Sequence, residues 1–421
     1  NPDSPIYGTK VDIPPGALNE DNVISISLPS AAPEVPLPGS LLPAGLNISF
    51  QPDNLKFNRP ISITIPYNDN DGDGLIDGTN MSEDGVYALT FTENSGQWLY
   101  ALKISQNNSD KTIKLITDSF SIYASAVDER DMLETSKASI FTIDGLSFSK
   151  IFPGYSDKAY EEFRPSYLRR ALISQSNLGL QDGDVYSYSG DINSGNFDAD
   201  SSWSGDSDLT PQLIHGSDKI KASVRMMLRS EFNKAKSANK NFVLVTHSWG
   251  TVLGFLGLQY CQNRFDAQYD IVPDLVITLS SPLGTGHRDF NLSDPFFPPL
   301  LSPVVSIMTD LVSEYTDTMI DITHLYSRGY YNSPKFKFWI NYYSFGDIIS
   351  GPINTVLNEA EDRKFHDENL LTNYSSTTQD HGVSSLDEDY WKEYLDSDQI
   401  SSIAVPFRSG IENILKSYIS Q

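Results

Sequence analysis

The sequence has only one cysteine, Cys261, and it is poor in basic residues. A single cysteine excludes an intrachain disulfide, and its place in an apolar stretch favours a buried structural thiol. The 30 Lys and Arg residues stand against 55 Asp and Glu residues, and the net charge of -25 disfavours nucleic acid and anionic membrane surfaces as partners. No stretch reaches the ~18 apolar residues that a transmembrane helix needs. We therefore expect no disulfide, no nucleic-acid partner and no transmembrane segment.

The chain is long enough for two or three domains, because it has 421 residues of which 39% are hydrophobic. Charged residues make up 20%, so the composition is that of a globular protein with a sizeable core. The sequence starts at Asn1 without a methionine, which favours removal of an initiator and a signal peptide. We expect a secreted or cell-surface bacterial protein whose signal peptide is not present in this chain.

Residues 1–127 have the pattern of an all-β domain. Short alternating stretches, clearest at Ile61, Ile63 and Ile65, are separated by turns rich in Pro, Gly, Asn and Asp. Two apolar stretches flank the turn at residues 93–96, which indicates a hairpin. Many short strands without a helical period predict a β-sandwich.

Three motifs in this region resemble the β-sandwich domain that netrin receptors and zonula-occludens proteins share, which also occurs in bacterial surface proteins. They are V-D-I-P-P-G-A-L at the start, F-x-x-P-x-x-I-x-I-P-Y from Phe57 to Tyr67, and S-F-S-x-Y-A from Ser119 to Ala124. The resemblance implies a non-catalytic domain. A contact with a surface or a lipid aggregate, through this domain or through a lid elsewhere in the chain, is left open.

An acidic loop, DNDGDGLIDGTN, occupies residues 69–80 inside this region. Its carboxylates alternate and a glycine follows at position six, a spacing that lets one tight turn wrap oxygens around a hard cation, with a backbone carbonyl as a further ligand. Position twelve is Asn80 rather than a bidentate glutamate, and an acidic turn without an ion is the alternative. We expect a structural Ca²⁺ whose ligands are Asp69, Asp71, Asp73, Leu75 and Asp77.

The remainder of the chain has a different organisation. Residues 128–138 are charged and have no strand pattern, and we expect a linker there. From residue 139 to residue 421, short apolar strands alternate with helical patterns, which predicts βαβ units and a mostly parallel sheet. A proline-broken apolar segment at 294–327 is too long for a simple connection, and either a cap or lid over the site or ordinary packing helices accounts for it.

The most informative stretch is residues 241–257, in which an apolar run leads into a serine and an apolar helical segment follows. Residues 242–245 have the composition of a buried parallel strand. Ser248 follows with almost no loop before the helix, and Gly250 lets the strand and helix backbones pass closely. Such a turn exposes the hydroxyl at the carboxyl end of the sheet and aims the amide of Trp249 at a developing oxyanion. It predicts a nucleophile, with a chance Ser-x-Gly as the alternative.

These residues resemble the nucleophile turn of the α/β-hydrolase superfamily, and of its lipases and esterases above all, with Thr246 in place of the usual first glycine. The resemblance implies a fold of the α/β class, namely a mostly parallel α/β-hydrolase sheet with flanking helices, preceded by the all-β sandwich domain. It also implies a catalytic triad in the chain order Ser, then Asp or Glu, then His.

A serine hydroxyl needs a base within hydrogen-bond reach, and the base needs an acid that orients it. Of the four histidines after Ser248, His381 lies in a polar, glycine-flanked loop near the chain end, and a similar histidine before Tyr-Trp occurs in many esterases. Asp347 follows an apolar strand and resembles the family's acid turn. The resemblance further implies a second oxyanion-hole amide after the first hydrolase strand, for which we choose Leu146 beside Trp249.

Together these residues predict a carboxylic ester hydrolase, an esterase or a lipase, that works through Ser248, Asp347 and His381 and an acyl-enzyme. The apolar segment before the acid suggests an ester substrate with an apolar acyl or aromatic group. We expect no cofactor in catalysis. The alternatives are an amidase or acyltransferase with the same triad, and a surface-binding or adhesive protein with an inactive hydrolase fold.

Overall fold

The structure is a computed structural model, and the residues it describes are 4–29, 37, 40–92, 96–132, 136–143, 167–170, 172–173, 176, 178–181, 183–188, 218–247, 249–262, 270–279, 281, 334–344, 361–365 and 414–420. The segment 294–327, for which a lid and packing helices were the two expectations, lies outside the described residues.

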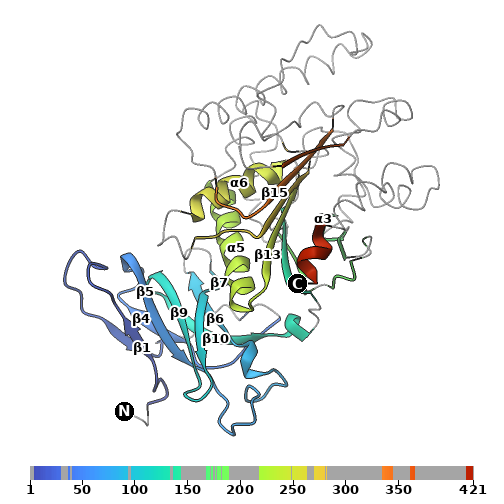
Figure 1. Cartoon of the computed structure of the whole chain (residues 1–421). Coiled ribbons are helices and arrows are strands. Elements are labelled where there is room, and N and C mark those ends of the chain that lie inside the picture. Colours follow the sequence, from blue (N-terminus) through green and yellow to red (C-terminus); the bar gives the residue numbers. More distant parts are fainter. Residues whose placement is uncertain are drawn as a thin grey trace, which may run out of the picture.

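Strands from the N-terminal part of the chain form two antiparallel sheets (Figure 1). The first has the order β1-β5-β9-β8, with the bounds Lys10–Asp12, Lys56–Pro66, Thr112–Ser119 and Leu102–Asn107. The second has the order β2-β4-β10-β6-β7, with the bounds Ser25–Ser27, Ile48–Gln51, Ile122–Asp128, Tyr87–Thr92 and Gln97–Tyr100, and β3 (Leu41–Pro43) pairs with β10. The expected hairpin is present, because β6 pairs with β7.

The two antiparallel sheets pack face to face around one apolar core. Ile61, Ile63 and Ile65 of β5 are buried and alternate with more exposed neighbours, as the sequence predicted. They share a core cluster with Phe50 of β4 and Tyr123 of β10, which belong to the second sheet. This two-layered structure is called the sandwich below.

A third sheet contains six strands, and every neighbouring pair is parallel. Its order is β12-β11-β13-β14-β15-β16, with the bounds Val185–Tyr188, Ala138–Ile143, Asn241–His247, Leu275–Leu279, Trp339–Ser344 and Glu361–Phe365. All six strands therefore point the same way, and their carboxyl ends meet at one edge of the sheet.

Helices pack on both faces of the parallel sheet. On one face, Leu228 of α5 (Asp218–Ser237) and Phe255 of α6 (Trp249–Cys261) share a core cluster with Leu244 of β13. On the other face, α3 (Tyr167–Arg170) and the helical residues 414–419 contribute Leu168 and Leu415 to a second cluster. Among the described residues we find no helix with the length and apolar character needed to cross a lipid bilayer.

The expected fold class, an α/β-hydrolase sheet with flanking helices, is wrong for the part of the chain that the structure describes. Strands make up 41% of these residues and helices 20%, and two of the three sheets are antiparallel. The family resemblance implies a helix-rich fold, whereas α5 and α6 are the only long helices among the described residues. The described protein is mostly β, with two antiparallel sheets and one parallel sheet.

Residues 128–138, where we expected a linker, connect the second antiparallel sheet to the parallel sheet directly. Asp128 is the last residue of β10, and Ala138 is the first residue of β11. A short 3₁₀ helix, η2 (Glu129–Met132), follows β10. Asp128 is fully buried, so the charges of this stretch are not all on a solvated connection.

Candidate functional site

A single residue, Ser248, separates one strand of the parallel sheet from the helix that follows it. β13 ends at His247, and α6 begins at Trp249. β13 is buried because the side chains of residues 242–245 alternate between two apolar clusters on opposite faces of the sheet. Ser248 itself lies outside the described residues, but the bounds of its neighbours leave one residue for the whole strand-to-helix connection. The strand and the helix that the sequence predicted around this serine are therefore confirmed.

The helix that follows Ser248 begins at the carboxyl edge of the parallel sheet. The first four N–H groups of an α-helix have no partner within the helix, and the helix dipole adds partial positive charge at this end. Trp249 is the first residue of α6, which has 13 residues. Its amide belongs to this set, so the backbone here can stabilise negative charge that develops beside Ser248.

The topology of the sheet marks the same edge independently. From β11 the chain adds β12 on one side of the sheet, whereas β13, β14, β15 and β16 follow on the other side. The strand order therefore reverses between β11 and β13. In open parallel sheets, ligands bind outside the carboxyl ends of the strands at such a reversal. Ser248 directly follows β13, and Leu146 is the third residue after the end of β11.

Thr246 connects the end of β13 to the first turns of α6, which sequence reasoning missed. Its Oγ1 donates a hydrogen bond to Thr251 Oγ1 at 3.1 Å, and both residues are buried. Its methyl group lies beside Gly254, where a Cβ atom added to the glycine would lie 3.1 Å from Thr246 Cγ2. Thr246 is therefore accommodated by a glycine on the facing helix. Its hydroxyl bridges the strand and the helix on either side of Ser248.

We expect Gly254→Ala to lower the free energy of unfolding by about 1–3 kcal/mol, because the added methyl overpacks the contact between α6 and β13. The matched control is the same change in a Thr246→Ser background, which removes the methyl at 3.1 Å and leaves the next neighbours, Ile143 and Leu244, at 3.5 and 3.6 Å. In the Thr246→Ser background, Gly254→Ala should be neutral or stabilising, since alanine is more favourable than glycine within a helix by about 1 kcal/mol. Urea unfolding of the four proteins tests this prediction, and an equal loss in both backgrounds contradicts it.

Buried polar side chains continue across the sheet from Thr246. Thr246 pairs in register with Thr278 of β14, and Thr278 pairs with Asn341 of β15. Thr278 Oγ1 donates to Asn341 Oδ1 at 2.8 Å and accepts a hydrogen bond from Trp339 Nε1 at 3.1 Å. Because each buried group here has a partner, this row joins β14 to β15, the strand that precedes Asp347.

Most of the predicted catalytic residues are not among those that the structure describes. Ser248, Leu146, Asp347 and His381 lie outside the described residues. Trp249 is described as the first residue of α6. Ser248 follows β13, and Asp347 is the third residue after the end of β15, so both stand after strands of the one parallel sheet. Their roles stay predictions.

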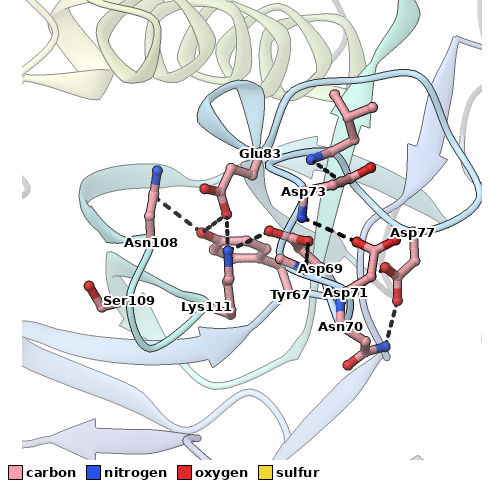
Figure 2. A network of polar contacts seen from close by, with 12 residues as sticks. Tyr67, Asp69, Asn70, Asp71, Asp73, Asp77, Glu83, Asn108, Ser109 and Lys111 are labelled. Carbon is pink, nitrogen blue, oxygen red and sulfur yellow. Dashed lines mark hydrogen bonds and ion pairs between the residues drawn. The ribbon is translucent and has the colours of Figure 1, made fainter.

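Three carboxylates of the acidic loop converge, as Figure 2 shows. Asp69, Asp71 and Asp77 each offer an oxygen, and these oxygens all lie within 4.8 Å of one another. Calcium–oxygen distances of ~2.3–2.6 Å place two ligands of one ion at most about 5 Å apart, so this set fits a single ion. Gly74, at position six, has φ +84°, a left-handed conformation that glycine adopts without strain. Asp73 is not one of the three, and its Oδ1 accepts a hydrogen bond from Leu75 N–H at 2.8 Å.

A lysine already pairs with part of this cluster. Lys111 Nζ forms ion pairs with Asp69 and, at 2.9 Å, with Glu83 (Figure 2). The hydrogen bond from Lys111 lowers the pKa of Asp69 below its usual value. Asp77 accepts a hydrogen bond from the Asn70 N–H at 3.0 Å. A calcium ion in this loop would share Asp69 with an ammonium group, which would weaken the site relative to one with three uncommitted carboxylates.

Two sequence comparisons assign no relationship to this chain. A scan against models of protein families finds no match, and a search of curated proteins finds no significant match. The case for a function therefore rests on the residues of the chain and on their arrangement.

Proposed function

We propose that the protein is a serine hydrolase that cleaves carboxylic esters, with Ser248 as its nucleophile. The observation that carries the proposal is the position of Ser248 as the single residue between β13 and α6, at the carboxyl edge of a parallel sheet beside its reversal of strand order. A serine there has its hydroxyl at an edge that binds ligands and a helix N-terminus beside it. The proposal does not depend on a helix-rich hydrolase fold.

In the proposed reaction, Ser248 Oγ attacks the ester carbonyl carbon while His381 takes the hydroxyl proton. Asp347 orients the imidazole and stabilises its cation, and the amides of Trp249 and Leu146 donate to the oxyanion. The carbon–oxygen bond to the alcohol then breaks, and His381 protonates the leaving alkoxide. Water attacks the acyl-enzyme after giving a proton to His381, and the acid departs as Ser248 recovers its proton. No cofactor takes part in these steps.

An apolar acyl or aromatic ester is the substrate class that we propose. The sequence before Asp347 is apolar and aromatic, and a chain with a net charge of -25 disfavours anionic substrates. The same triad could also serve an amidase or an acyltransferase, which differ in the leaving group or the acceptor. The remaining alternative is a surface-binding protein without catalytic activity.

The proposal is tested with p-nitrophenyl esters that run from short to long acyl chains. We expect hydrolysis of at least part of the series, and the chain length of the best substrate separates an esterase from a lipase. The matching anilides and an added alcohol acceptor measure amidase and acyltransferase activity. A folded protein that hydrolyses no ester in the series contradicts the proposed function, whichever of the other activities it shows.

We also propose that the acidic loop binds a structural calcium ion. The support is the convergence of Asp69, Asp71 and Asp77 and the left-handed Gly74 at the bend. The loop lies in the sandwich, whereas Ser248 follows a strand of the parallel sheet, so the ion has no part in the chemistry. Its role would be to stabilise the folded state by binding it in preference to the unfolded chain.

Calcium is therefore expected to raise the free energy of unfolding, by about 2.7 kcal/mol when its concentration is one hundred times Kd. Thermal unfolding in calcium and in EDTA measures the effect. Asp71→Asn should abolish the response, whereas Asp110→Asn, which changes an exposed aspartate near Lys111 that is not in the cluster, should retain it. A wild-type melting temperature that is equal in calcium and in EDTA contradicts the proposed ion.

A further inference from the structure

The second sheet of the sandwich is buried on both of its faces. An antiparallel sheet usually packs one face on a core and leaves the other to water. Here one face of the sheet carries Ala88 and Tyr123 into the sandwich core, and the opposite face carries a separate buried cluster. That cluster consists of Leu41, Tyr87, Leu89, Phe91, Trp98, Tyr100, Ala124 and Ala126, and Ala238, just after α5, packs against it. The face of this sheet that points away from the sandwich core is therefore apolar and covered.

Helix α5 contacts this sheet at its edge strand, β7 (Figure 1). An edge strand presents backbone N–H and C=O groups without strand partners. At Tyr100 both groups are bonded by side chains of α5, because the N–H donates to Ser230 Oγ at 3.0 Å and the carbonyl accepts from Asn233 Nδ2 at 2.9 Å. Ser230 and Asn233 are both buried. Two helical side chains thus supply the hydrogen bonds that a further strand would make.

A buried ionic cluster joins the same helix to the end of β10. Lys234 of α5 is 3% exposed, and its Nζ lies 3.2 Å from carboxylate oxygens of Asp128 and of Asp131. Arg130 pairs with Asp128 at 2.7 Å and stacks over the ring of Tyr186 in β12, with its Cζ 5.3 Å from the ring centroid. The sandwich therefore contacts the parallel-sheet part through an ionic cluster in which Asp128 and Lys234 are removed from water. Such groups are costly to bury unless each keeps its partners.

The opposite side of α5 belongs to the core of the parallel sheet. Val224, Leu228 and Phe232 pack with Phe242 and Leu244 of β13. The helix ends at Ser237, and β13 begins four residues later at Asn241. One helix is thus shared by the sandwich and by the strand that leads to Ser248.

We propose that the sandwich is a fixed structural layer over α5, and that it unfolds together with the parallel sheet rather than as a separable binding module. Two observations carry this inference, namely the edge-strand hydrogen bonds from α5 and the buried ionic cluster at Lys234. The proposal goes beyond the proposed function and does not depend on the reaction that the protein catalyses.

Native-state hydrogen exchange of the full chain, read by mass spectrometry, tests the proposal with a change far from the interface. Ile63 is fully buried in the sandwich core, and among the described residues none from the parallel-sheet part belongs to its cluster. Ile63→Val should accelerate global exchange of β5 by roughly twofold to tenfold. If the two parts unfold together, hydrogen exchange of the amides of β13 and β14 accelerates by the same factor as that of β5. Acceleration in β5 with unchanged β13 and β14 overturns the proposal.

A second pair of variants tests the interface itself. Lys234→Met removes the buried ammonium, whereas Lys114→Met removes an exposed one, whose 3.1 Å ion pair with Asp12 has side chains 37% and 66% exposed. Lys234→Met should accelerate exchange in both the sandwich and the parallel sheet by about a hundredfold or more. Lys114→Met should change either by less than about fivefold. Equal, small effects of the two variants overturn the proposal.

Discussion

Replacement of Ser248 with alanine is expected to lower kcat for ester hydrolysis by about a millionfold, the loss that follows removal of the triad serine in subtilisin. The reason is that alanine cannot form the acyl-enzyme, so the remaining rate comes only from binding and from the oxyanion donors. Single-turnover and steady-state assays with the best p-nitrophenyl ester measure the loss.

The matched control for this change is Ser281→Ala. Ser281 is a buried serine two residues beyond β14, the strand next to β13, and it has no place in the proposed mechanism. Its replacement should leave kcat far above that of Ser248→Ala, because the nucleophile and the acyl-enzyme remain available. Activity that survives in Ser248→Ala contradicts the assignment of the nucleophile, and an equal loss in both variants shows damage to the sheet edge instead.

The three proposed catalytic residues should also behave as one unit. In a working triad, removal of the serine costs nearly as much as removal of all three members. His381→Ala should therefore cause a large loss alone and almost none in a protein that already carries Ser248→Ala. Multiplicative losses in the double variant would place His381 outside the reaction of Ser248.

Asp128→Asn is expected to lower the free energy of unfolding by about 3–5 kcal/mol, the usual cost of removing one partner from a buried ion pair. Asp128 is fully buried, accepts hydrogen bonds from Arg130 and from the hydroxyl of Tyr100, and pairs with Lys234. Asparagine preserves the shape and leaves two cations short of a counter-charge. Equilibrium urea unfolding measures the loss, with Asp12→Asn in an exposed ion pair as the control at under about 1 kcal/mol.

The effect of Asp128→Asn should shrink as the pH falls. Burial alone would raise the pKa of Asp128, but the hydrogen bonds from Arg130 and the charge of Lys234 outweigh burial and hold the pKa well below its usual 3.8. A depressed pKa contributes stability that is complete above the unfolded-state value and is lost as the pH falls below it. Below about pH 4 the wild type loses the stability that ionised Asp128 contributes, whereas the variant has no carboxylate at this position. The difference between their free energies of unfolding therefore narrows. A difference that stays constant from pH 7 to pH 3 contradicts this account of Asp128.

The parts of the fold that sequence reasoning found are those with a local pattern. The alternation of Ile61, Ile63 and Ile65 identified β5, and the unbroken apolar run before Thr246 identified β13. β16 (Glu361–Phe365) was missed because its sequence EDRKF is nearly all charged and gives no strand signal at the edge of the sheet. The fold class was wrong because the family resemblance implied more helix than the described residues contain.

Interactions between distant residues could not be read from the sequence. Asp128 and Arg130 stand in a charged stretch that has the composition of a solvated linker, and their burial depends on Lys234, about one hundred positions later. The same holds near Ser248, since the space for the Thr246 methyl group depends on the absence of a side chain at Gly254. The one signal in the sequence that could have explained a threonine at position 246 was Gly254, a glycine on the helix that follows the strand.

The most direct test of the central claim is labelling with an alkyl phosphonofluoridate, followed by intact mass measurement and peptide mapping. Attack by Ser248 Oγ forms a phosphorus–oxygen bond and expels fluoride, while His381 takes the hydroxyl proton. We expect one adduct per folded chain, on Ser248, with a proportional loss of ester hydrolysis and no adduct after denaturation. An enzyme that remains fully active with Ser248 unmodified, or that loses activity through an adduct on another residue, contradicts it.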